Sequence, residues 1–137
     1  MNRLTLAYWI VTGLMALYMS LGAGLDVVGA ADARALITHL GYPLYFMPYI
    51  GVLKLLGIIA VLVPGYARLK EWAYAGLLFD VTGALYSAIA VGDALPTWIP
   101  AFLGIVLIGG SYALYRWRSR LDINPLPART SLTTMKA

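Results

Sequence analysis

Residues Gly51–Asp80 read GVLKLLGIIAVLVPGYARLKEWAYAGLLFD, and this stretch alone indicates the class of protein. It contains one long apolar segment, a short basic turn and most of a second apolar segment. Lys54 lies near the middle of the first segment, and Asp80 lies near the middle of the second. An ionisable side chain at the centre of a membrane helix costs about 2.5–3.5 kcal/mol on insertion scales, so both residues need a physical reason.

The composition is that of a protein embedded in lipid. Of the 137 residues, 61% are hydrophobic and only 12% are charged. The net charge of +4 comes from basic residues that lie beside apolar segments, a pattern that favours the lipid bilayer over nucleic acid as partner. The sequence has no cysteine, which excludes thiol–disulfide exchange, zinc–thiolate sites and cysteine-ligated iron–sulfur clusters.

Four apolar segments predict four transmembrane helices, at approximately residues 4–24, 43–63, 71–91 and 97–117. At about 1.5 Å per residue, each is long enough to cross a hydrocarbon core of about 30 Å. We expect Pro43 to open the second helix and Pro48 to kink it. Between the first two helices, we expect Asp32 to cap a short interfacial helix that ends at Leu40.

The basic residues predict the orientation. One side of the membrane collects Arg3, Arg68, Lys70, Arg116, Arg118, Arg120, Arg129 and Lys136, whereas the other has Arg34. By the positive-inside rule, both termini lie in the cytoplasm. The predicted fold is therefore all-α: an antiparallel bundle of four transmembrane helices over residues 1–120, followed by a flexible cytoplasmic tail over residues 121–137.

In such a bundle the second and third helices are antiparallel neighbours, so Lys54 and Asp80 lie at one depth and neutralise each other. Tyr86 follows Asp80 by six residues and Ser87 follows it by seven, and we add both to this candidate polar centre. Two interpretations stay open. The pair is a structural contact that fixes the register of two helices, or it binds a proton, a quinone head group or another ligand.

No motif indicates a catalytic residue or a metal, haem or flavin site, which leaves a quinone as the cofactor still open. His39 is the one histidine, so haem held by paired histidines is excluded within one chain. We expect His39 to be a polar residue at the outer interface. We expect Glu71 to be a solvated partner of Arg68 or Lys70.

The run HLGYPLYFMPYIGVLKLLGIIAVLVPGYARLKEWAYAGLLFDVTGALYSAIAVGD, residues His39–Asp93, resembles the DoxX-like family of small bacterial four-helix integral membrane proteins. Its GVLKLLG and KEWAYAG…FD blocks carry the resemblance, and the opening YWIVTGLMALYMSLGAG also fits it. The resemblance implies a four-helix membrane fold and, for most members, no established activity. Some members of the wider superfamily are linked to thiosulfate–quinone oxidoreduction or to membrane oxidoreductase complexes, and an animal relative assists receptor assembly.

Three functions stay open. The first is a non-enzymatic subunit or assembly partner in the bacterial cytoplasmic membrane, organised by Lys54 and Asp80 and contacting a membrane protein or a second copy of itself. The second is a quinone- or lipid-binding subunit of a membrane oxidoreductase. The third is a small dimeric transporter. A neutral Lys54–Asp80 pair argues against the third, because it leaves no carboxylate to couple protons.

Overall fold

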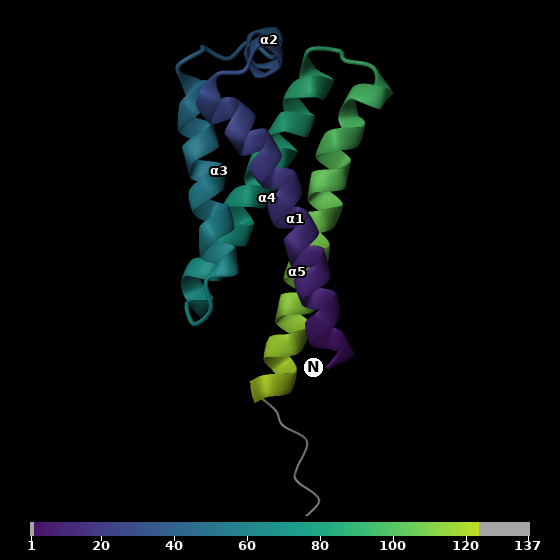
Figure 1. Ribbon diagram of the computed structural model, residues 1–137. Coiled ribbons are helices and arrows are strands. Elements are labelled where there is room, and N and C mark those ends of the chain that lie inside the picture. The colour runs from purple at the N-terminus through teal and green to yellow at the C-terminus, as the bar shows by residue number, and fades with distance from the viewer. Residues whose placement is uncertain (1, 124–137) are drawn as a thin grey trace, which may run out of the picture.

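The computed structural model describes residues 2–123 as a set of helices (Figure 1). Within this range there are five α-helices, one short 3-10 helix and no strand, so the all-helical prediction is confirmed. The elements are α1 (Arg3–Val28), α2 (Ala31–His39), α3 (Phe46–Leu62), α4 (Ala67–Ala90), η1 (Leu95–Trp98) and α5 (Ile99–Ile123). The predicted tail begins inside α5, and its residues 124–137 lie outside the described part of the chain.

Helix α1 runs further than its apolar sequence indicates. The Asn2 side chain caps it by accepting a hydrogen bond from the Leu4 N–H, and Gly29 ends it in the left-handed conformation at φ 70°. The last turn therefore includes Asp26, which the sequence places just after the first apolar segment. Asp26, which lies beyond the predicted helix over residues 4–24, is therefore part of α1.

Helix α3 begins later than predicted, at Phe46 rather than at Pro43. Pro48 is then its third residue, where a backbone N–H has no partner within the helix, so the expectation that Pro48 kinks the helix is wrong. With 17 residues, α3 is about 26 Å long. Helix α2 exists as predicted, but Ala30 and not Asp32 stands at its N-cap.

Each of the four long helices packs against two of the others, so the contacts close into a ring. Helix α1 lies against α3 and α5, and α4 lies against the same two helices, while α2 contacts α1 and α3. Figure 1 shows the N-terminus, the α3–α4 turn and the last turns of α5 toward one end of the molecule, and α2 at the opposite end. Residues from all these long helices form the core: Met15, Ala16, Met19, Ile58, Val61, Tyr74, Leu77, Val81 and Ile108.

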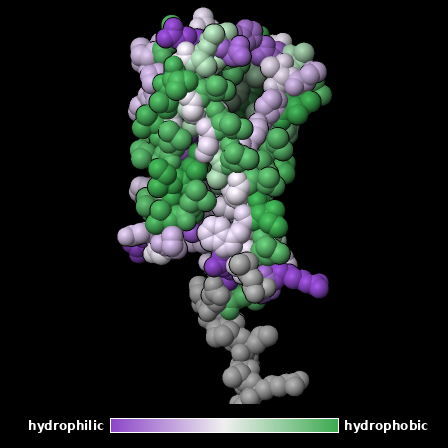
Figure 2. Space-filling model, viewed as in Figure 1, coloured by the Kyte–Doolittle hydropathy of each residue, from purple (hydrophilic) through white to green (hydrophobic). Residues whose placement is uncertain are grey.

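The surface is apolar around the middle of the molecule and polar toward both ends (Figure 2). Among residues 2–123, α1, α4 and the stretch Leu95–Leu121 are long and apolar enough to cross a membrane, whereas α3 is a shorter apolar helix. Three of the four predicted spans thus have the length and composition of a membrane helix, and the second predicted span is shorter than expected.

Candidate functional site: a polar triad beside apolar cavities

Lys54 is the centre of a cluster that joins three helices. Its Nζ donates a 2.9 Å hydrogen bond to Oδ2 of Asp26 on α1 and lies 3.5 Å from Oδ2 of Asp80 on α4. The three side chains are only 13–18% exposed. We call Asp26, Lys54 and Asp80 the polar triad. The structure thus brings together the two residues that the sequence pairs, and it adds a second carboxylate.

The close contact between α1 and α3 explains why Asp26 takes the shorter interaction. Gly51 lies on α3, one turn before Lys54, and a Cβ at this position would stand 2.9 Å from Cβ of Asp26 and 3.1 Å from the Ala23 carbonyl oxygen. Only glycine admits α1 this closely. One signal in the sequence could have placed Asp26 in the site, because Gly29 is a typical C-terminal cap and extends the helix past Asp26.

The two other residues assigned to the polar centre do not join the triad. Tyr86 is 74% exposed on the outside of α4, since six residues along a helix leave it about 120° away from Asp80. Ser87 is buried, but its hydroxyl donates to the Gly83 carbonyl at 2.8 Å and receives the Tyr42 hydroxyl at 2.8 Å. Ser87 therefore connects α4 to the segment between α2 and α3 through its hydrogen bond with Tyr42.

Cavities adjoin the polar triad on several sides. Lys54 and Asp80 both line cavities of about 320, 360 and 440 Å³, and Asp26 lines the second of these. The first two share Ile50 of α3 and Gly76 of α4 in their walls, and α2 also lines the second through Leu36 and Ile37. Apart from the triad, nearly all their lining residues are apolar or aromatic. The triad is thus the polar end of an apolar groove.

Helix α2 covers the third cavity. Leu36 lines it from α2, Leu40 lines it from the residue that follows α2, and Asp93 lines it from the loop after α4. Nε2 of His39 lies 2.6 Å from Oδ1 of Asp93, so the end of α2 is tied to that loop. His39 is 55% exposed at the end of the molecule where we expect the outer interface. Its contact with Asp93 is one that the sequence does not reveal.

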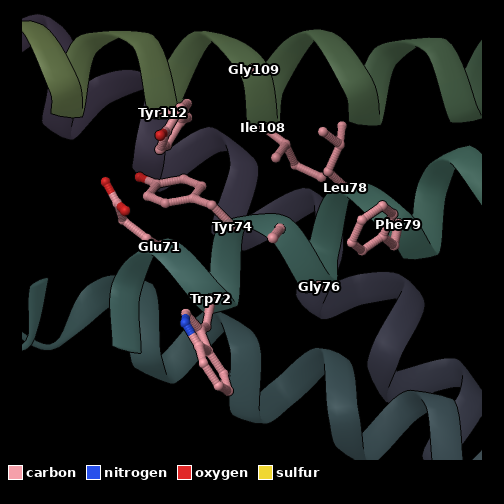
Figure 3. A pocket seen from close by; sticks show the side chains of 10 residues that line it. Glu71, Trp72, Tyr74, Gly76, Leu78, Phe79, Ile108, Gly109 and Tyr112 are labelled. Carbon is pink, nitrogen blue, oxygen red and sulfur yellow. The ribbon is translucent and has the colours of Figure 1, made fainter. Parts of the chain in front are cut away.

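A larger cavity of about 700 Å³ lies between α4 and α5 and contains neither Lys54 nor Asp80 (Figure 3). Figure 3 shows Glu71, Tyr74 and Tyr112 close together at one end of it. Glu71 accepts a 2.9 Å hydrogen bond from Arg116, so the expectation that it pairs with Arg68 or Lys70 is wrong. The Glu71 carboxylate is already paired with Arg116 at the surface. This cavity therefore offers a ligand fewer charged partners than the groove at the triad does.

A second polar cluster is buried between α1, α4 and α5. The Ser111 hydroxyl lies 2.6 Å from that of Thr12 and 2.7 Å from that of Tyr74, and the Tyr8 hydroxyl is buried without a partner among residues 2–123. The sequence does not predict this cluster, because Thr12 and Ser111 are isolated hydroxyl residues in separate apolar segments. Its short contacts between neutral groups are those of a helix-packing element.

The polar triad offers one ammonium donor and two carboxylate acceptors to whatever enters the groove. Among residues 2–123, no group of three or more histidine, cysteine, aspartate or glutamate side chains is placed to hold a metal ion. The chemistry available at the triad is therefore hydrogen bonding and charge pairing in a region of low polarity, where such interactions are stronger than in water.

No curated protein and no solved structure matches the chain. The sequence model described as the DoxX-like family matches residues 10–110, which include all three residues of the polar triad. This match and the apolar helices make the chain a membrane protein whose activity is not established. The chain belongs to the DoxX-like family.

Proposed function

We propose that all four long helices, α3 included, cross the bacterial cytoplasmic membrane as an antiparallel bundle. Support comes from the packing of α3 against both α1 and α4, which gives it the same surroundings as the helices of full length. Its length of about 26 Å is close to the hydrocarbon thickness, and local thinning of the bilayer accommodates such a small mismatch. Helix α2 then lies at the interface.

The basic residues support a cytoplasmic location for both termini. Arg3, Arg68 and Arg116 lie near the helix ends that share one side of the bundle, whereas α2 and Asp93 lie toward the opposite side (Figure 1). Positive charge is retained on the cytoplasmic side during insertion. In this orientation the polar triad lies nearer the outer face, because Asp26 is in the last turn of α1.

Within that membrane, we propose that the protein is a non-enzymatic subunit that binds a lipophilic molecule and presents it to a partner protein. One observation carries the proposal: the polar triad is the polar end of apolar cavities of about 320–440 Å³. Cavities of this size with a few convergent polar groups are typical of small-molecule sites. A lipid or quinone fits this description, with its polar group at Lys54 and Asp80 and its tail along the groove.

Filling the groove tests this function. A Cβ at Gly76 or Gly83 meets no atom within 4 Å, so Gly76→Leu and Gly83→Leu should add bulk to the groove, although Gly76 also lines the cavity between α4 and α5. Gly109→Leu, in the cavity between α4 and α5, is the matched control. We expect native mass spectrometry to find an amphiphile bound to the wild-type protein and to Gly109→Leu, and much less of it on the two groove variants. Equal amounts on all four proteins would exclude the groove as the binding site.

A transporter is the second candidate, and Asp26 favours it. A neutral Lys54–Asp80 pair would leave no carboxylate to couple protons. The structure instead places two carboxylates around one ammonium, which leaves one carboxylate available for a proton or a cationic substrate. Flux into proteoliposomes that is lost in Asp80→Asn but retained in Asp32→Asn, on exposed α2, would identify transport. Binding without any flux would leave the binding function alone.

A further inference from the structure

The charge of the polar triad restricts what the groove can bind. Two carboxylates share one ammonium, so the ionised triad carries one net negative charge. Lys54 donates a 2.9 Å hydrogen bond to Asp26, whereas its contact with the Asp80 carboxylate is longer, at 3.5 Å, and therefore weaker. Asp80 nevertheless lines all three cavities at the triad. Lys54 lines them too, so the more weakly paired carboxylate of the triad faces the groove beside the ammonium.

Aromatic rings lie beside the same carboxylates. Tyr42, Phe46 and Phe79 line the cavity of about 360 Å³ that also contains Asp26 and Asp80. The Tyr42 and Phe46 rings are stacked, with their centroids 5.1 Å apart. Aromatic faces attract cations, and a site that combines them with a carboxylate favours organic ammonium groups. This observation is independent of the charge count and indicates the same class of ligand.

We propose that the groove between α3 and α4 binds a lipophilic cation, an amphiphile with a protonated amine head and an apolar body, and that Asp80 is its counter-ion. The proposal rests on the ligand-binding function above and specifies its ligand class. A quinone carbonyl can accept a hydrogen bond from Lys54 but offers no donor to Asp80. An anionic lipid head adds negative charge to a triad that already has an excess of it.

The groove accommodates both parts of such a molecule. The ammonium lies between Asp80 and the aromatic residues, and the tail follows the cavity of about 320 Å³ lined by Leu53, Leu56 and Leu77. Gly76 lines both cavities, and the space where its side chain would stand is open. The head and the tail can therefore occupy one continuous path along α4.

The test compares probes that share one tail. The wild-type protein in phosphatidylcholine nanodiscs is titrated with tritiated dodecylammonium, and unlabelled dodecanol and dodecanoate serve as competitors, with empty nanodiscs as the background. We expect dodecylammonium to bind at least about tenfold more tightly than dodecanol, because its ammonium forms a charge-assisted hydrogen bond with Asp80 that a hydroxyl does not. Dodecanoate is expected to compete least.

Variants locate the effect. Asp80→Asn should abolish the preference for the cation, and Asp32→Asn, which removes an exposed carboxylate on α2, should retain it. Phe46→Leu keeps an apolar wall and should weaken binding of the cation but not of dodecanol, so the proposal stays testable if Asp80→Asn does not fold. If dodecanol competes as well as the cation, the ligand class is wrong while the binding function stands. If neither is retained above empty nanodiscs, both proposals fail.

Discussion

Lys54 is the residue on which the centre of the bundle depends, because one ammonium serves carboxylates on two other helices. Replacing it with methionine keeps most of the side-chain volume but leaves Asp26 and Asp80 facing each other without a counter-charge. We expect Lys54→Met to lower the free energy of unfolding by about 3–5 kcal/mol, the usual effect of removing one partner from a shielded ion pair. Reversible unfolding in mixed micelles measures this loss.

The two aspartates provide the internal control for that experiment. Asp26→Asn weakens a 2.9 Å hydrogen bond, whereas Asp80→Asn changes a 3.5 Å contact, so Asp26→Asn should be the more destabilising of the two. Either substitution removes the excess negative charge of the triad, so the difference between the two variants reports on the length of the contact that each one loses. If Lys54→Met unfolds like the wild-type protein, the three side chains do not meet.

A buried hydroxyl contact is a second test at the scale of single residues. Thr12 is fully buried and its hydroxyl lies 2.6 Å from that of Ser111, so Thr12→Val removes one of the two hydroxyl contacts of Ser111 and leaves the one with Tyr74. We expect a loss of about 0.5–1.5 kcal/mol in unfolding free energy. Thr82→Val is the matched control, since Thr82 is exposed and bonds only carbonyls of its own helix. Equal effects of the two substitutions would contradict the buried network.

How much of the site the sequence could predict depends on the kind of residue. Lys54 and Asp80 stand out because a charge within an apolar helix is rare, and their meeting follows from the short turn between their helices. Asp26 lies at the end of an apolar run, where a charge is ordinary; the cap at Gly29 indicates that the helix includes it, and the contact at Gly51 shows which residues it meets. Tyr86 shares only a broad side of the helix with Asp80, and sequence does not separate a tyrosine in a pocket from one of the many that lie at the membrane–water interface.

At the scale of elements, the packing of α1 on α3 depends on Gly51. Its missing side chain leaves room for Asp26 and Ala23, which would lie within about 3 Å of an added Cβ. We expect Gly51→Ala to destabilise the bundle and to weaken the Lys54–Asp26 contact, because backbone atoms must move. Gly76→Ala, on α4 with open space around it, should instead stabilise by about 0.5–1 kcal/mol through helix propensity. Thermal unfolding of both variants measures these changes. If the two substitutions shift the melting temperature in the same direction, the effect is that of replacing any helical glycine and not of the close contact at Gly51.

Helix α2 is held by a single polar contact at its end, and this gives a prediction about its dynamics. His39→Ala removes the 2.6 Å contact with Asp93, and we expect faster hydrogen exchange of the α2 amides without a change in α4. Thr38→Ala, an exposed substitution on the same helix, should leave exchange unaltered. Unchanged exchange in His39→Ala would mean that apolar contacts of Leu36 and Leu40 hold α2 by themselves.

Helix boundaries were harder to predict than the helices themselves. The existence of each apolar helix follows from its uninterrupted hydrophobic run. No water hydrogen-bonds the backbone inside a bilayer, so such a run satisfies its N–H and C=O groups by forming a helix. The start of α3 depends instead on competition between Pro43 and Pro48 for the first turn, and either choice leaves a proline where its missing N–H is tolerated. A start at Pro43 would also put Pro48 in the helix interior, where its missing N–H leaves a carbonyl without a partner, and the observed start at Phe46 avoids this cost.

For the whole molecule, the decisive question is whether α3 crosses the membrane, because the positions of both termini depend on it. The chain has no cysteine, so single cysteines can report on each end of α3 without background labelling. Thr38 on α2 and Ala67 at the start of α4 flank this helix and are both exposed. In intact cells, we expect a membrane-impermeant maleimide to label Thr38→Cys and to leave Ala67→Cys unlabelled until the membrane is permeabilised.

The reason for this expectation is the distribution of charge. Arg68 and Lys70 follow Ala67 directly, and moving them across the membrane against the potential is unfavourable, whereas the α2 side carries Asp32 and Asp93. Ala94→Cys, beyond α4, is the control and should be labelled with Thr38→Cys. Labelling of Thr38→Cys and Ala67→Cys but not of Ala94→Cys in intact cells would show that α3 does not cross, because α4 then carries Ala94 to the inner side. Labelling of Ala67→Cys alone would reverse the topology, so that the polar triad would lie nearer the cytoplasmic face.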